Sequence, residues 1–156
     1  MAEQLKICSF NVHGVKNCNW QYLRKVVSEH HFALIQEHWL IPSEFHLFED
    51  HLPNVNVICS SGIDETKLLR GRPHGGCAII WHSDLNCSVV PVEIENERIC
   101  AVRANIDGLD IFLASIYMPC DTLSDVHSNV VFVDTLNDIS SLVESLGINA
   151  VICGGD

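Results

Sequence analysis

The sequence predicts an α/β domain in which helices pack on a mixed β-sheet, and three observations predict it. Apolar runs of strand length alternate with amphipathic stretches near the N-terminus, four such runs follow one another between residues 75 and 117, and a helical stretch before an apolar run closes the chain. Strands that alternate with helices favour parallel pairing, whereas consecutive strands favour antiparallel pairing. At 156 residues the chain can bury one core, so we expect a single domain over 1–156.

The N-terminal elements are predicted from apolar spacing and from helix-start signals. Strands are expected over 5–12, 32–36 and 55–59, where apolar residues run together. Asn19 can cap a helix that places Leu23, Val26 and Val27 on one side. Pro42 suits the start of a short helical segment, and a loop is expected over 60–74.

The remaining elements are four strands, a helix and a last strand. The strands are expected over 75–82, 87–94, 98–106 and 109–117, and Asp107-Gly108 is a favoured two-residue hairpin turn between the last two. Apolar residues recur at three- and four-residue steps from Val133 to Leu146, which predicts a helix that Gly147 ends. The run 148–153 predicts the final strand.

The composition indicates a globular intracellular protein, in the nucleus or the cytoplasm, with no membrane partner. Hydrophobic residues make up 47% of the chain, which excludes disorder, and no stretch reaches the ~20 apolar residues of a membrane helix. No secretory signal opens the sequence. Five cysteines lie in apolar strand-like runs, which favours free buried thiols over disulfides or a zinc site: Cys8, Cys59, Cys77, Cys100 and Cys153.

Polar residues stand at the ends of three predicted strands. Asn11 and His13 end the first, Glu37 ends the second and Asp156 ends the last. Strand ends at one edge of a sheet are where α/β proteins place their chemistry. A carboxylate at that edge suits Mg²⁺, which takes one or two carboxylates and keeps several waters. Glu37 is therefore the first candidate metal ligand, and a solvated glutamate at a strand end is the alternative.

Five short motifs strengthen that interpretation through their order along the chain. They are Ser9-Phe10-Asn11-Val12-His13-Gly14, Leu34-Ile35-Gln36-Glu37, Gly75-Gly76-Cys77-Ala78-Ile79-Ile80, Ile116-Tyr117-Met118-Pro119 and Gly154-Gly155-Asp156. In this order they resemble the motifs of the endonuclease/exonuclease/phosphatase superfamily, which includes DNase I and the apurinic/apyrimidinic endonucleases. The stretches 35–40 and 70–77 are most similar to endonuclease domains of non-LTR retrotransposons, in which a fused reverse transcriptase would be a partner.

The resemblance implies a fold, a reaction and a set of site residues. The fold would be a DNase I-like sandwich of two mixed β-sheets flanked by helices. The reaction would be phosphodiester hydrolysis that depends on Mg²⁺, with Mn²⁺ as a substitute and DNA nicking as the leading activity. Asn11 and Glu37 would hold the metal, Tyr117 would contact the scissile phosphate, and Asp156 would orient the attacking water or stabilise the leaving oxygen.

The chain also departs from the family pattern. His13 stands where members often carry an acidic residue, so we expect it to contact phosphate, and Cys120 replaces a common asparagine. The late aspartate-histidine pair that supplies the general base has no counterpart, and the resemblance implies that most of the second sheet follows Asp156. We therefore expect an incomplete domain that is inactive alone, with Asp156 poorly held and one sheet face uncovered.

The net charge of −11 argues against a nucleic-acid substrate, because Lys and Arg supply most of the affinity for phosphates. Arg72 and His74 lie in a locally basic stretch that would face phosphate, with a solvated charged loop as the alternative. Two other functions stay open, a phosphatase or phosphodiesterase of phosphoinositides or small phosphoesters, and a non-catalytic relic or binding remnant. No serine-nucleophile, P-loop or His-Glu-x-x-His motif occurs.

Overall fold

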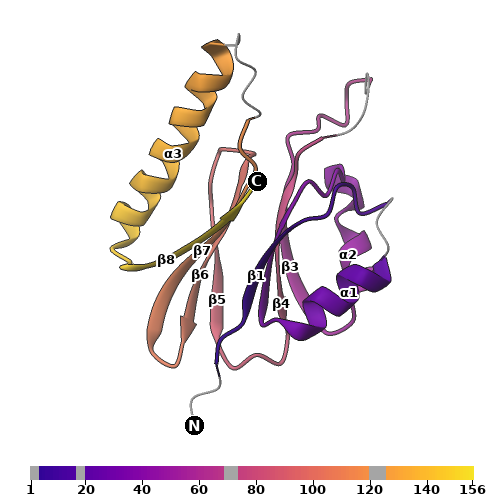
Figure 1. Cartoon of the computed structure of the whole chain (residues 1–156), viewed down its shortest axis with the longest axis vertical. Helices are drawn as coiled ribbons and strands as arrows, with labels where there is room; N and C mark the ends of the chain where they lie inside the picture. Colours follow the sequence, from indigo (N-terminus) through magenta and orange to yellow (C-terminus); the bar gives the residue numbers. More distant parts are fainter. Residues whose placement is uncertain (1–3, 17–19, 69–73, 120–125) are drawn as a thin grey trace.

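Two four-stranded sheets stack face to face, with helices on both outer faces (Figure 1). The computed structural model describes residues 4–16, 20–68, 74–119 and 126–156. The first sheet has the order β1-β2-β4-β3 and the second β5-β6-β7-β8. The strands are β1 (Ile7–Asn11), β2 (Phe32–Gln36), β3 (Val55–Ser60), β4 (Cys77–His82), β5 (Ser88–Val92), β6 (Ile99–Ile106), β7 (Leu109–Ile116) and β8 (Ala150–Gly155). The helices are α1 (Trp20–Glu29), α2 (His46–His51) and α3 (Val126–Leu146), with a 3₁₀ turn over Pro42–Glu44.

Both sheets are mixed, as the resemblance implies. Strand β1 pairs with β2 in parallel and β7 pairs with β8 in parallel, and each of these pairs is joined through a helical connection. The other neighbours, β2-β4, β3-β4, β5-β6 and β6-β7, are antiparallel. Parallel neighbours need a crossover, whereas the Asp107-Gly108 turn is enough to join β6 to β7.

The core lies in three layers because the two sheets pack on each other and each carries helical structure on its outer face. Along β2, Phe32 and Leu34 face the second sheet, whereas Ala33 and Ile35 face the helices α1 and α2. All five residues of β2 are buried, which explains why this strand reads as a continuous apolar run. Helix α3 covers the outer face of the second sheet, with Ile139 and Val143 packed against its core.

The expectation that most of the second sheet follows Asp156 is wrong, and the expected uncovered surface is limited to the edge strand β8, where Val151 and Ile152 are exposed. Strands β5 to β8 all lie within residues 88–155 and pack on the first sheet through Val102 and Leu113. Apolar side chains are exposed on α3 as well as on β8. The largest of these are Val130, Phe132, Val133, Leu136, Val151 and Ile152.

Some element limits and side-chain environments differ from the predictions. Helix α3 begins well before Val133, because its first turns carry exposed apolar residues that the core pattern does not register. Free thiols are confirmed for the described cysteines, and burial raises the pKa of Cys77 to about 12. Cys153 is exposed, so its predicted burial is wrong, because β8 is an edge strand. Asn19 lies outside the described residues. None of the described helices is long and apolar enough to cross a membrane.

Candidate functional site

Strand ends from both sheets meet at one end of the sandwich. The carboxyl ends of β1 and β2 lie beside the amino end of β4, because Asn11 pairs with Gln36 and Gln36 with Cys77. In the second sheet the carboxyl ends of β7 and β8 lie beside the amino end of β6 in the same way. The edge strands β1 and β8 are also close to each other, so the residues that follow these strands share one surface.

Asn11 connects the two sheets through its side-chain amide. Its Nδ2 donates to Glu37 Oε1 at 3.1 Å and to Asp156 Oδ2 at 2.5 Å. Its Oδ1 accepts a hydrogen bond from the backbone N–H of His13 at 2.9 Å, which orients the amide. Two carboxylates at short range repel each other unless a donor or a cation lies between them. The amide of Asn11 supplies that donor.

Glu37 is held from both of its carboxylate oxygens. Asn11 contacts Oε1, and the indole Nε1 of Trp39 donates to Oε2 at 2.9 Å. His13 Nδ1 lies 3.8 Å from the same Oε2. The Glu37 side chain is 16% exposed and that of His13 is 66% exposed, so the carboxylate is recessed beneath an accessible imidazole.

The backbone around Glu37 adopts a conformation that L-residues rarely take. Among the described residues, five non-glycine positions have positive φ, and three of them belong to this site: His13 at 50°, Glu37 at 55° and Trp39 at 59°. Such positions cost about 1–3 kcal/mol each and persist where surrounding structure enforces them. The backbone strain of this domain is therefore concentrated around the carboxylate of Glu37.

Gly14 makes room for the indole of Trp39. Its φ is +90°, and a Cβ at this position would lie 2.1 Å from Trp39 Cε3. Backbone bonds hold the two segments together, since Gly14 N–H donates to Glu37 O at 2.8 Å and Trp39 N–H donates to Gly75 O at 3.1 Å. The His13 ring contacts the indole at 4.8 Å between centroids. The indole is thus fixed between Gly14 and the carboxylate of Glu37.

A buried polar network supports the strand ends from between the two sheets. Gln36 Nε2 donates to Ser115 Oγ at 3.0 Å, and Ser9 Oγ donates to Gln36 Oε1 at 3.3 Å. Ser115 Oγ in turn donates to Ile35 O at 2.6 Å, so β2 and β7 are joined directly. A Cβ at Gly154 would lie 2.6 Å from Ser9 Oγ, which explains why a glycine precedes the end of β8.

Asp156 is better held than the sequence predicts. Its backbone N–H donates to Ile116 O at 3.3 Å, its backbone oxygen accepts from Met118 N–H at 3.0 Å, and its side chain accepts from Asn11. The expectation that its geometry is loose is wrong, because β7 provides the backbone partners and Asn11 provides the side-chain partner.

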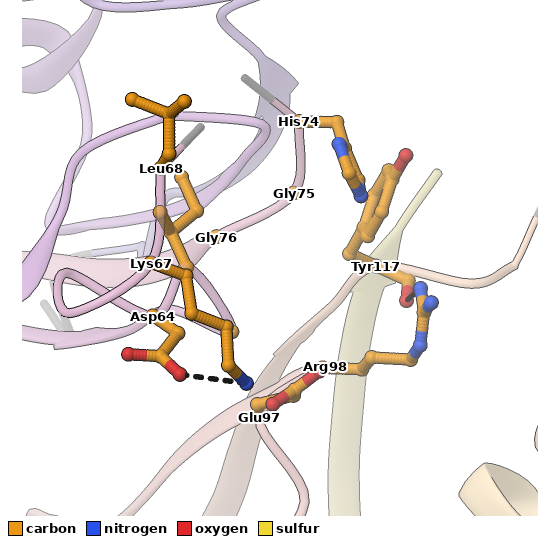
Figure 2. Close-up of a pocket in the computed structure, with 11 residues that line it drawn as sticks. Asp64, Lys67, Leu68, His74, Gly75, Gly76, Glu97, Arg98 and Tyr117 are labelled. Carbon is orange, nitrogen blue, oxygen red and sulfur yellow. Dashed lines mark hydrogen bonds and ion pairs between the residues drawn. The ribbon is translucent and has the colours of Figure 1, made fainter. Parts of the chain in front are cut away.

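Tyr117 lies directly beyond the end of β7 and forms one wall of a pocket (Figure 2). Its backbone N–H donates to Arg98 O at 2.9 Å, and the Arg98 guanidinium carbon lies 5.4 Å from the centroid of its ring. The pocket encloses about 340 Å³ and is bounded on its other side by Lys67 and Leu68. His74 lies beside Tyr117 on the same wall.

His38 supports the segment that follows β2 from inside the core. It is fully buried, its Nδ1 accepts a hydrogen bond from Leu40 N–H at 3.0 Å, and its Nε2 lies 3.0 Å from Ser60 O. This pattern places the proton on Nε2. Burial lowers the pKa of His38 to about 4, which keeps the imidazole neutral.

The carboxylates of Glu37 and Asp156 at the strand ends are ligands of the type that magnesium prefers. Over the described part of the chain, no three His, Cys, Asp or Glu side chains converge as a metal-binding group. Two carboxylates converge there as hard oxygen donors, and Asn11 turns its Nδ2 toward both of them, whereas its Oδ1 accepts from His13 N–H. Mg²⁺ binds through one or two carboxylates and keeps several waters, so this set suits it better than zinc, which prefers nitrogen and sulfur ligands.

The structure brings together most of the residues that the sequence predicts for the site. Asn11, His13, Glu37 and Asp156 form one cluster, Tyr117 follows the strand next to Asp156, and His74 lines the adjoining pocket. Arg72 lies outside the described residues.

Sequence reasoning missed four residues at this end of the sandwich: Gln36, Trp39, Arg98 and Ser115. A signal existed for Gln36, which is a polar residue inside an apolar run directly before the candidate ligand. The other three act through contacts that join distant segments or through backbone geometry, which no local pattern reports.

Comparison with known proteins identifies the fold. No protein-family profile matches the sequence, and no curated protein matches it. Among solved structures, the endonuclease domain of TRAS1, a telomere-specific non-LTR retrotransposon, is similar with a TM-score of 0.66 and 18% identity, over 97% of this chain and 59% of that one. An AP endonuclease from Archaeoglobus fulgidus matches with a TM-score of 0.63 and 18% identity, over 98% and 57% of the two chains. The 3′ phosphatase NExo from Neisseria matches with a TM-score of 0.65 and 13% identity, also over 98% and 57%.

The three matches share one architecture with this chain, and each covers a similar part of the solved structure. The chain spans 57–59% of the length of these three solved structures. Its two mixed four-stranded sheets with flanking helices match their architecture. The chain therefore has a DNase I-like α/β fold, the fold of these solved structures.

Proposed function

We propose that the chain carries the metal- and phosphate-binding part of a Mg²⁺-dependent phosphodiesterase that nicks DNA. The observation that supports this most is the Asn11 amide between the carboxylates of Glu37 and Asp156, at the strand ends where the five motifs meet. The structural neighbours named above include two endonucleases and a 3′ phosphatase, which agrees with phosphoester chemistry.

Glu37 and Asn11 would hold the metal ion in this proposal. Mn²⁺ would replace Mg²⁺, because both accept carboxylate and amide oxygens. When bound, the ion would neutralise charge on the phosphate under attack. Trp39 fixes Glu37 Oε2, and Asn11 fixes Glu37 Oε1 and Asp156 Oδ2, so both carboxylates are held in defined positions.

The remaining residues would act on the phosphate and the water. The hydroxyl of Tyr117 would donate to a phosphate oxygen, and the exposed imidazole of His13 would donate to another. Asp156 would orient the attacking water through its free carboxylate capacity. A late aspartate-histidine pair has no counterpart in the sequence, so we expect these 156 residues alone to show at most a slow residual hydrolysis, far below that of a complete domain.

The experiment combines metal binding with nicking of supercoiled plasmid. We expect one Mn²⁺ site by calorimetry and slow Mg²⁺-dependent nicking, both lost in Glu37→Gln. Glu144→Gln removes the same charge from the exposed face of α3 and is the matched control, which should keep both properties. Metal binding and nicking that survive Glu37→Gln would refute the assignment. Metal binding without any nicking would favour a binding remnant.

A small phosphoester is the second candidate substrate, and the net charge of −11 favours it, because such a molecule meets less repulsion than a DNA strand. Hydrolysis of phosphoinositide headgroups and nucleoside monophosphates, compared with plasmid nicking under the same metal conditions, separates the two substrates. Faster turnover of a small phosphoester that also depends on Glu37 would favour this second candidate.

A further inference from the structure

We propose that the pocket beside Tyr117 binds a nucleobase that flanks the phosphate under attack, with a preference for bases that carry an amino group. The inference rests on the proposed function for the identity of the ligand. The pocket itself is defined by the fold, since it lies between the segment 62–68, the glycines before β4, the residues before β6 and Tyr117. Its volume of about 340 Å³ is in the lower part of the range for small-molecule sites, roughly 300–1,000 Å³.

The walls of the pocket suit a flat ring. Figure 2 shows Tyr117 and His74 on one side and the side chains of Lys67 and Leu68 on the other. Leu68 is 85% exposed, so its apolar side chain is accessible to a ligand in the pocket. Gly75 leaves the tyrosine ring accessible, because a Cβ there would already contact Tyr117 Cδ1 at 3.5 Å. Bases stack on aromatic rings whatever their sequence, since every base has a π-face.

The charges of the pocket favour a base over a second phosphate. Lys67 is paired with Asp64 at 2.9 Å, and the pocket lining contains one further cation, Arg98, whose guanidinium lies near the Tyr117 ring, and one further carboxylate, Glu97. Two cations and two carboxylates leave no positive excess to attract an anion. The Glu97 carboxylate accepts hydrogen bonds only, and it lies over Gly62, where a Cβ would be 2.4 Å from its Cδ. A carboxylate in this place can accept a hydrogen bond from an exocyclic amino group, which cytosine, guanine and adenine carry and thymine lacks.

Tyr117 connects this pocket to the proposed phosphate site. Its position is set on one side by Arg98 O and on the other by the end of β7 next to β8, where Met118 N–H bonds to Asp156 O. A nucleotide whose phosphate meets the tyrosine hydroxyl would therefore place its base against the same residue. This arrangement would orient a single strand across the end of the sandwich.

The test titrates the ¹⁵N-labelled chain with dGMP, dCMP, dTMP and deoxyribose 5-phosphate, without metal, and follows the backbone amides of Gly62, Gly75 and Gly76. We expect dGMP and dCMP to shift these amides with a Kd at least roughly fivefold below that of dTMP, and the sugar phosphate to leave them in place. In Glu97→Gln the difference between dCMP and dTMP should disappear, whereas Glu144→Gln should keep it.

Two results would overturn the inference. One is equal shifts of these glycines by the sugar phosphate, which would mean a phosphate site. The other is the absence of any nucleotide-dependent shift at the three glycines. Because no hydrolysis is involved, either failure is separate from a failure of the proposed function, which shows as metal binding and nicking that do not depend on Glu37.

Discussion

The indole Nε1 of Trp39 donates a hydrogen bond to Glu37 Oε2 at 2.9 Å. The tryptophan therefore orients the carboxylate of Glu37. The bond requires the left-handed backbone at both positions and the absence of a side chain at Gly14. Groups that orient a metal ligand commonly change metal affinity or activity by about 10–100-fold when removed. Four predictions follow the geometry around this carboxylate and the loop that carries it.

Trp39→Phe keeps the ring and removes only the N–H donor. We expect Mn²⁺ affinity to fall by about 10–100-fold, because the carboxylate of Glu37 loses its fixed rotamer. Isothermal titration calorimetry measures this directly. Trp20→Phe makes the same chemical change on α1, beside Phe48 and His51, and should leave the affinity unchanged. An unchanged affinity in Trp39→Phe would show that the indole does not position Glu37.

Gly14→Ala should destabilise the domain and displace the indole of Trp39. The new Cβ meets both an unfavourable φ and the ring of Trp39 at 2.1 Å. Gly108→Ala is the matched control, since Gly108 has a φ of +85° but open space around its Cβ. We expect about 1 kcal/mol of lost unfolding free energy in the control and about 2–4 kcal/mol in Gly14→Ala. Equal losses in urea denaturation would mean that the indole accommodates the methyl group.

Asn11→Asp places a third carboxylate beside Glu37 and Asp156. Without a cation the variant should be less stable, by about 1–3 kcal/mol, because charge-assisted hydrogen bonds are replaced by repulsion. Bound Mn²⁺ relieves that repulsion, so the metal should raise the Tm of the variant by more than that of the unsubstituted chain. Asn56→Asp adds the same charge at an exposed position of β3 and should show no such gain. Equal metal-induced shifts of Tm in Asn11→Asp and in the unsubstituted chain would contradict a cation site at Asn11.

The domain should lose stability in mild acid through His38. The folded pKa is about 4, below the ~6.5 of an unfolded chain, so the unfolded state binds the proton more strongly. Stability is therefore complete above pH 6.5 and falls by about 3 kcal/mol as the pH drops to 4. His38→Asn can still accept from Leu40 N–H and should flatten this dependence, whereas the exposed His46→Asn should not. Urea denaturation midpoints measured from pH 4 to pH 6.5 test this. A pH dependence that is the same in His38→Asn and in the unsubstituted chain would contradict the role of His38.

Local patterns in the sequence predict most of the elements and the central site residues. The apolar run 32–36 followed by Glu37 predicts both a buried strand and a carboxylate at its end, because strand geometry and burial follow from neighbouring residues. The helix before Gly147 and the Asp107-Gly108 hairpin are confirmed for the same reason. The resemblance to nuclease motifs adds the two-sheet sandwich, which the structure confirms.

Tertiary structure decides how these pieces meet. Strand periodicity does not reveal which sheet a strand joins, so the formation of the second sheet by β5 to β8 was not predicted. The bond between Asn11 and Asp156 joins residues that are 145 positions apart, and it exists only because the edge strands of two sheets lie side by side. The direction of the Trp39 indole likewise depends on left-handed backbone at three positions and on space above Gly14. The sequence by itself determined most of the helices and strands and the place of Glu37 at the end of β2, whereas packing between distant segments determined the partners that hold its carboxylate.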